Sequence, residues 1–196
     1  MDADTLKAVR ALRPGKILKT PEQVADSVTS LVAAVGKHFD IAGRHRTIDV
    51  VPVLDAAFML AADFVRQWHN TYGLDLHVHF ARVSTYHGTA RTEPPTVLWL
   101  GDPPDERDVV VLDTIIDTGA TMTAVLHELY SRPRHSQILG AALLARAPAG
   151  GLPPLLSRGP VIAPTILTTK KFIVGYGLDY VGHYRQLPWI AELREP

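Results

Sequence analysis

Val109 to Thr121 reads VVVLDTIIDTGAT, and this stretch decides the predicted fold. Its first four residues are apolar and mostly β-branched, which is typical of a strand buried on both faces. Small residues follow Asp117, and from Met122 to Tyr130 apolar side chains recur at the spacing of a helix. The stretch therefore predicts a buried strand, a tight turn and a helix.

Two aspartates mark the turn, because Asp113 ends the apolar run and Asp117 opens the small residues. Residues 118–121 can present backbone N–H groups and hydroxyls at the helix N-terminus. Such an arrangement binds a phosphate group without a basic side chain. The alternative is that Asp117 only caps the helix in an ordinary strand-to-helix turn. The spacing alone leaves both interpretations open.

The rest of the chain predicts strands that alternate with helices. Further strands are expected at 48–54, 74–83, 138–144, 161–167 and 172–176, and helices at 24–35 and 56–68. This alternation favours an α/β fold, with a mainly parallel sheet and helices on both faces. Ligands of such sheets bind at the carboxyl ends of the strands, so the site is expected just after Leu112.

Two regions are less regular. The first 45 residues are predicted to be helical, with Thr20 as an N-cap followed by a proline. Residues 84–107 are interrupted by proline and glycine and predict a long loop, in which only 96–100 is a strand. A loop of this length in a compact domain more often has a function than not.

The chain has 196 residues, 20 Lys and Arg against 20 Asp and Glu, and no cysteine. This length fits a single domain over residues 1–196. Zero net charge gives no electrostatic case for nucleic acid or a membrane surface as a partner. The lack of cysteine excludes disulfides, thiolate catalysis and zinc sites that need sulfur. With no apolar run near the ~18 residues of a membrane helix and no recognisable secretory signal, a cytoplasmic protein is expected.

A second motif lies near the C-terminus, where residues 171–180 read KFIVGYGLDY and residues 184–188 read YRQLP. Together with residues 109–121, this motif resembles the type I phosphoribosyltransferases, and most closely the hypoxanthine-guanine phosphoribosyltransferases. Weaker similarity to the same family outside the two motifs extends the resemblance over residues 48–190. It implies the type I phosphoribosyltransferase fold, with a core over about residues 45–170. A small hood subdomain would come from the N-terminal segment and residues 171–196.

The resemblance also implies a reaction. A 5-phosphoribosyl group would pass from phosphoribosyl pyrophosphate to a small heterocyclic base, a purine of the hypoxanthine or guanine type, with release of pyrophosphate. The cofactor implied is Mg²⁺, which would neutralise the leaving group. Family members usually form dimers or tetramers, so a homodimer or homotetramer is expected.

Site residues follow from the resemblance by position. Asp117 would be the general base at the purine, and Arg185 would contact pyrophosphate. Asp113 and Asp179 would hold Mg²⁺, and Asp113 would also bind the ribose hydroxyls. The other substrate-binding positions are Thr114 beside the ribose, Thr118, Gly119, Ala120 and Thr121 around the 5-phosphate, Lys171, Phe172 and Ile173 at the base, Asp55 and Ala56 in the pyrophosphate loop, and Thr85 and Tyr86 at the root of a mobile loop.

The sequence departs from the family pattern at four positions. Thr114 replaces the second of two adjacent acids, and Ala120 stands where lysine is common. Asp55 brings a negative charge to the pyrophosphate loop, and Ala145 is assigned to the lysine that contacts the purine 6-oxo group. Two further hypotheses therefore stay open. One is a transferase whose acceptor is a modified base, a pyrimidine or a hydroxyl; the other is a non-catalytic regulatory protein that binds phosphoribosyl pyrophosphate or a nucleotide.

Residues 115–121, IIDTGAT, also resemble the Asp-Thr-Gly turn of retroviral-type aspartic proteases. In those enzymes two chains bring two carboxylates together to share a proton. That fold continues in β-strands after the turn, whereas the residues after Thr121 have helical spacing. The order of elements along the chain thus separates the two interpretations.

Overall fold

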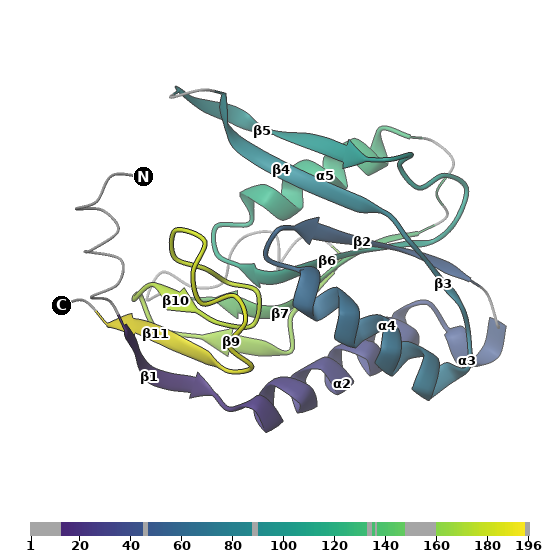
Figure 1. The fold of residues 1–196 in the computed structure, drawn as a ribbon. Helices are drawn as coiled ribbons and strands as arrows, with labels where there is room; N and C mark the ends of the chain where they lie inside the picture. Colours follow the sequence, from purple (N-terminus) through teal and green to yellow (C-terminus); the bar gives the residue numbers. More distant parts are fainter. Residues whose placement is uncertain are drawn as a thin grey trace.

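The computed structural model describes residues 13–44, 47–87, 90–132, 135, 137–147 and 160–194. The strands of its central sheet are β2 (Ile48–Leu54), β3 (Leu76–Val78), β4 (Phe80–His87), β5 (Ala90–Leu100), β6 (Val109–Ile116), β7 (Ile138–Arg146), β8 (Val161–Ile162) and β9 (Thr165–Leu167). They lie in the order β5-β4-β2-β6-β7-β8, with β3 paired to β2 and β9 to β7 (Figure 1). All these pairs are parallel except β4–β5, which confirms the predicted mainly parallel sheet.

Helices cover both faces of this sheet. The helices α2 (Pro21–His38) and α4 (Phe58–Tyr72) lie on one face, and α5 (Ala120–Tyr130) lies on the other, with the short α3 (Ile41–Arg44) beside α2 (Figure 1). Helix α2 begins at a capping box, because the Gln23 N–H donates to Thr20 Oγ1 and the Gln23 side chain accepts from the Thr20 N–H. No helix in the described part of the chain is long and apolar enough to cross a bilayer.

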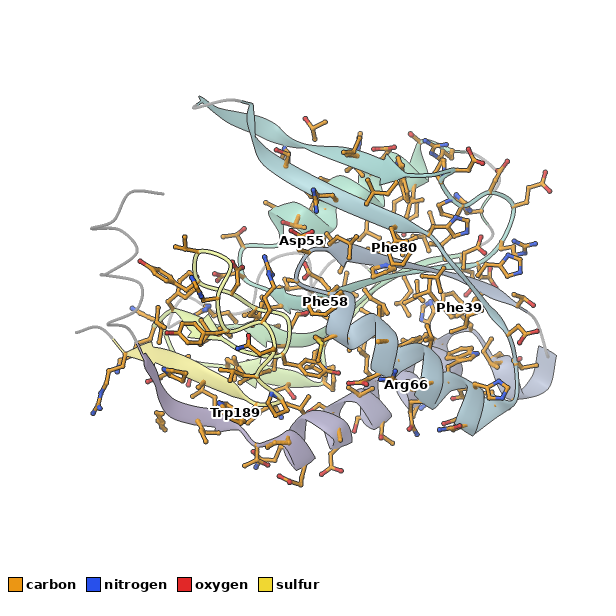
Figure 2. The ribbon with its side chains drawn as sticks, in the orientation of Figure 1. Phe39, Asp55, Phe58, Arg66, Phe80 and Trp189 are labelled. Atoms are coloured by element: carbon orange, nitrogen blue, oxygen red, sulfur yellow. The ribbon has the colours of Figure 1, made fainter. Side chains whose placement is uncertain are left out.

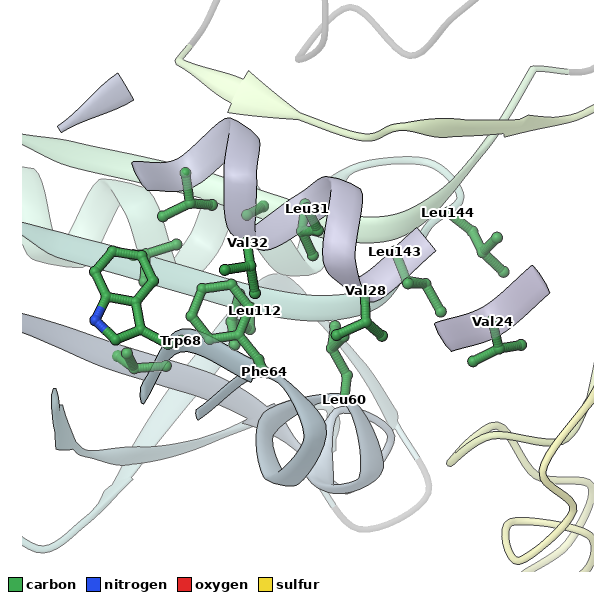
Figure 3. Close-up of a cluster of buried hydrophobic side chains, with 14 of the residues drawn as sticks. Val24, Val28, Leu31, Val32, Leu60, Phe64, Trp68, Leu112, Leu143 and Leu144 are labelled. Atoms are coloured by element: carbon green, nitrogen blue, oxygen red, sulfur yellow. The ribbon is translucent and has the colours of Figure 1, made fainter. Parts of the chain in front are cut away.

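The core has two halves because successive side chains of a strand point to opposite faces. In β6, Val110 and Leu112 face the cluster under α2 and α4, while Val109 and Val111 face the cluster under α5. Figure 3 shows the first cluster, where Phe64 and Trp68 stack with their ring centroids 5.8 Å apart. Burying each such side chain stabilises the fold by about 1.5–3 kcal/mol.

The two chain ends meet in a small antiparallel sheet. It has the order β1-β11-β10, formed by β1 (Arg13–Lys19), β11 (Ile190–Arg194) and β10 (Ile173–Val174). The expectation that the first 45 residues are helical is therefore wrong for residues 13–19. Local propensity could not reveal this strand, because its partner β11 lies more than 170 positions away along the chain. Residues 1–12 lie outside the described part.

The expectation of a long loop at 84–107 is also wrong over most of its length. Residues 80–87 and 90–100 form the antiparallel arm β4–β5, with Phe80 opposite Leu100 and Val83 opposite Val97. Pro94 and Pro95 are compatible with this strand because β5 is an edge strand, where a missing backbone donor leaves no ladder bond unmade. The arm stands over α5 (Figure 1).

Candidate active site

A cavity of about 370 Å³ opens at the carboxyl ends of β2 and β6, where the topology predicts a ligand site. Three segments surround it: the turn after β2, the turn after β6 and the loop at 179–185. Figure 2 shows Asp55 at the first of these, where β2 ends. The cavity is lined by Val53, Leu54, Asp55, Ala56, Val83, Asp113, Ile115, Ile116, Asp117, Thr118, Gly119, Ala120, Thr121, Met122, Asp179 and Arg185.

The turn after β6 opens the N-terminus of α5 toward the cavity. Gly119 is its N-cap residue with φ of 87°, a conformation that favours glycine. Gly119 has no side chain to cap the helix, and the Thr118 hydroxyl accepts from the Ala120 N–H, 3.3 Å away. Asp117 therefore does not act as the helix cap, and the donors of the first turn beyond Ala120 stay available to an anion. The turn leads into a helix, not a strand, which also removes the aspartic-protease interpretation.

Asp117 is instead paired with an arginine from the neighbouring strand. Arg146 Nε lies 3.1 Å from Asp117 Oδ1. The same guanidinium donates through Nη1 to the carbonyls of Thr169 and Lys171, at 2.7 and 2.9 Å. Arg146 thus joins the candidate general base to the segment that precedes Phe172.

This placement corrects the assignment of Ala145 to the base-contacting position. Ala145 is fully buried in the cluster under α5. Arg146 follows it in the strand and points to the opposite face, because side chains alternate. The side chain of this strand that lies against Asp117 is therefore a cationic hydrogen-bond donor.

Asp113 and Thr114 have different surroundings. Asp113 lines the cavity with only 8% of its surface exposed. Burial raises the pKa of the Asp113 carboxyl to about 7, against the opposing effect of hydrogen bonds from the backbone of Ile115 and Thr114. Thr114 is fully buried and does not line the cavity; its hydroxyl donates to the Ala56 carbonyl at 3.0 Å. Thr114 braces the turn after β2 and is not placed to touch a sugar.

That turn carries Asp55 and Ala56, and the Leu54–Asp55 peptide is cis. Asp55 Oδ1 accepts a hydrogen bond of 2.5 Å from Arg82 Nη2, and its Oδ2 lies 4.0 Å from Arg185 Nη2. Arg185 also pairs with Asp179 at 3.0 Å and donates to the Gly177 carbonyl at 2.6 Å. The predicted residues Asp55, Asp179 and Arg185 are thus brought together. The sequence carried no signal for Arg82, because only the pairing of β4 with β2 places it here.

The predicted base-binding residues lie beside this cavity and do not line it. Phe172 is 54% exposed and meets the Tyr180 ring edge-on, with centroids 5.6 Å apart. Lys171 Nζ pairs with Glu192 at 3.3 Å, and Ile173 is buried. An exposed aromatic face next to Arg146 and Asp117 is suited to a planar heterocycle.

Thr85 and Tyr86 belong to β4, and their side chains lie outside the described residues. A second cavity of about 860 Å³ runs between β5 and α5 and shares residues 118–120 with the first. Glu128 lines this second cavity and accepts a hydrogen bond from the Trp99 indole. The Arg132 guanidinium lies 6.0 Å from the Trp99 ring centroid. The base of the arm is thereby attached to α5.

No group of three or more His, Asp or Glu side chains arranged for a metal ion is found among the described residues. Four aspartates line the same cavity; Asp55 pairs with Arg82 and Asp117 with Arg146, while Asp113 and Asp179 are the predicted metal ligands. Two carboxylates are too few for an all-protein cage. They fit a cation such as Mg²⁺, which commonly takes one or two carboxylates and completes its shell with substrate phosphates and water.

Comparison with known proteins agrees with this geometry. Residues 18–181 match the phosphoribosyl transferase domain family. The chain is 31% identical over 157 residues to the hypoxanthine-guanine phosphoribosyltransferase of Staphylococcus epidermidis, covering 77% of this chain and 80% of the relative. It is 26% identical to the Dictyostelium discoideum enzyme of that name, covering 92% and 96%. The Trypanosoma cruzi hypoxanthine phosphoribosyltransferase in complex with the product IMP superposes with a TM-score of 0.71 at 25% identity, covering 92% and 95%. The chain therefore belongs to the type I phosphoribosyltransferases, close to the hypoxanthine-guanine phosphoribosyltransferases.

Proposed function

We propose that this protein transfers the 5-phosphoribosyl group of phosphoribosyl pyrophosphate to a ring nitrogen of a 6-oxopurine and releases pyrophosphate. The observation that supports it best is a single cavity lined by Asp113, residues 117–121, Asp179 and Arg185. These residues come from separate segments of the chain. The turn after β6 suits the sugar phosphate, and Asp179 and Arg185 suit the pyrophosphate group. The names of the similar curated proteins support a purine as the acceptor.

The turn after β6 would hold the sugar phosphate. The uncapped N-terminus of α5 offers backbone N–H groups to the 5-phosphate, and Thr118 and Thr121 add hydroxyls. Ala120 costs nothing in this arrangement, because the backbone is the donor. Asp113 faces the same cavity and would accept hydrogen bonds from the ribose hydroxyls.

The other end of the cavity suits pyrophosphate. Arg185 presents a guanidinium there, and Asp113 and Asp179 would hold Mg²⁺ together with substrate oxygens. When bound, the ion would stabilise the negative charge that develops on the leaving pyrophosphate. The protein's own part is to orient Arg185, which its bonds to Asp179 and Gly177 achieve.

The purine would lie between Phe172 and the Asp117–Arg146 pair. Phe172 would stack on the base, and the adjacent Ile173 backbone would read its edge. Asp117 would accept the proton of a ring nitrogen, and Arg146 would donate to the 6-oxo group. Arg146 Nε lies 3.1 Å from Asp117 Oδ1 but is a buried donor without a hydrogen-bond partner among the described residues. A site with such a donor discriminates strongly against bases that lack the matching acceptor.

The decisive test is nucleotide formation from phosphoribosyl pyrophosphate and Mg²⁺ with hypoxanthine, guanine, adenine and uracil offered separately. We expect nucleotide from the two 6-oxopurines and much less from adenine or uracil. Measurable binding of phosphoribosyl pyrophosphate without nucleotide from any base would contradict the proposal and favour a regulatory role. Activity with uracil alone would place the acceptor in another class.

We also propose a homodimer, formed through the face of the arm that α5 does not cover. Phe80, Leu98 and Leu100 are 42–55% exposed there, which is unusual for neighbouring large apolar side chains. Figure 2 shows Phe80 on β4. Because the net charge is zero, identical chains do not repel one another, so a second copy is the favoured occupant of this face. Light scattering should show a dimer for the native chain and a monomer for Phe80→Asp; an unchanged mass would refute this interface.

A further inference from the structure

One carboxylate lies where the proposed function needs positive charge. Asp55 sits in the turn after β2 and lines the cavity, with its side chain 48% exposed. Its two oxygens face two different guanidiniums, Arg82 at 2.5 Å and Arg185 at 4.0 Å. The side chain thus holds the position in which a bound oxyanion would meet the same two cations.

The backbone sets this position. Leu54 is paired with Arg82 across β2 and β4, so the next residue, Asp55, emerges beside that arginine. Thr114 donates to the Ala56 carbonyl. Gly177 packs so closely against the same carbonyl that a Cβ there would lie 2.0 Å from the Ala56 oxygen. A backbone shift that moved the Asp55 carboxylate away would therefore have to break these contacts.

The charges of the ion pairs near this end of the cavity balance. Arg82 and Arg185 contribute two positive charges, and Asp55 and Asp179 contribute two negative ones, all within one chain of ion pairs. A pyrophosphate group can bind Arg82 and Arg185 only if their ion pairs with the Asp55 carboxylate break. The anion must also approach that carboxylate well within the ~8–10 Å screening length of physiological salt, so the two negative groups repel each other.

We infer that Asp55 is an internal competitor for the pyrophosphate group: its carboxylate pairs with Arg82 and Arg185 and is displaced by the incoming anion. The inference rests on the proposed function, since it takes Arg185 as the pyrophosphate contact. Asp55 then weakens the binding of pyrophosphate and of substrates that carry it, and it speeds the departure of the product. It acts through the two arginines and is a positioning residue.

The test is titration calorimetry of inorganic pyrophosphate with Mg²⁺ against the native protein, Asp55→Asn and Asp75→Asn. Asparagine keeps the size of the side chain and removes its charge. Asp75 is an exposed matched control, because it lies past the other end of the 15-residue helix α4, about 22 Å away at 1.5 Å per residue. We expect Asp55→Asn to bind pyrophosphate at least tenfold more tightly, with a steeper fall of affinity on adding salt. Asp75→Asn should match the native protein.

A second variant moves the affinity in the opposite direction. Arg82→Gln leaves Asp55 with Arg185 alone, so pyrophosphate should bind several-fold more weakly. Equal or weaker binding by Asp55→Asn, while the native protein binds pyrophosphate, would overturn the inference and leave the proposed function standing. Weaker binding restored only by high Mg²⁺ would show that Asp55 holds a cation. No binding of pyrophosphate to the native protein would overturn both.

Discussion

Asp113 allows the sharpest quantitative prediction. Its carboxyl has an ordinary pKa of 3.8 and a pKa of about 7 in the folded protein, because it is buried. In the pH range between these values the folded state binds more protons than the unfolded state, so the free energy of unfolding falls as pH rises. Above pH 7 the full difference of about 3 pKa units corresponds to about 4 kcal/mol, at 1.36 kcal/mol per unit.

Asp113→Asn removes this titration. At pH 9 the native protein carries the whole cost of about 4.4 kcal/mol, whereas at pH 5 it carries only about 1.6 kcal/mol, since only the range from 3.8 to 5 has been titrated. The free energy of unfolding of the variant minus that of the native protein should therefore grow by about 3 kcal/mol from pH 5 to pH 9. Any loss from the altered hydrogen bonds is independent of pH and cancels in this change.

Urea denaturation followed by tryptophan fluorescence measures the difference at each pH, in EDTA so that no divalent cation lowers the carboxyl pKa. Trp68 is fully buried and reports unfolding. The exposed Asp75→Asn variant is the control for the loss of one carboxylate at the surface. A difference between Asp113→Asn and the native protein that stays constant from pH 5 to pH 9 would refute the reasoning.

Four further predictions concern the site. Asp117→Asn should lower kcat by about 10²–10⁴-fold with phosphoribosyl pyrophosphate binding intact; an unchanged rate would exclude it as the base. Phe172→Ala should weaken base binding by about 1–3 kcal/mol, seen in KM for the base, and leave the sugar phosphate unaffected. Arg146→Ala should raise the KM of hypoxanthine far more than that of adenine, with Arg146→Lys partly restoring it; equal effects would argue for a purely structural role. Gly177→Ala should cost about 2–4 kcal/mol in urea unfolding, because its φ is +90° and its Cβ would lie 2.0 Å from the Ala56 oxygen.

Local sequence was sufficient for elements whose signals are local. The apolar run at 109–112, the small residues after Asp117 and the helical spacing from Met122 predicted β6, its turn and α5 correctly. The same holds for α2, where Thr20 and Pro21 mark the N-terminus. Once β6 belongs to a parallel sheet, the place of the cavity follows from topology.

Pairings between distant segments were not predictable in this way. Strand β1 exists because β11 lies beside it, and the arm β4–β5 exists because the proline-containing edge strand β5 pairs with β4. For β1 the hydrogen-bond partner lies at the other end of the chain, so a window of neighbouring residues contains no record of it. For β5 the two prolines hide the strand, because they are compatible with it only at the edge of the sheet.

For the site, the sequence by itself determined the chemical types: Asp113 and Asp117 around one strand end, and Phe172, Asp179 and Arg185 in a second motif. Only the tertiary structure decided what each faces. It showed that Thr114 holds the Ala56 turn, that Arg146 and not Ala145 reaches Asp117, and that Asp55 lies between Arg82 and Arg185. The physical reason is that a side chain's direction depends on strand register and alternation, and its charge state on burial, and both are set by the packing of segments far apart in the chain.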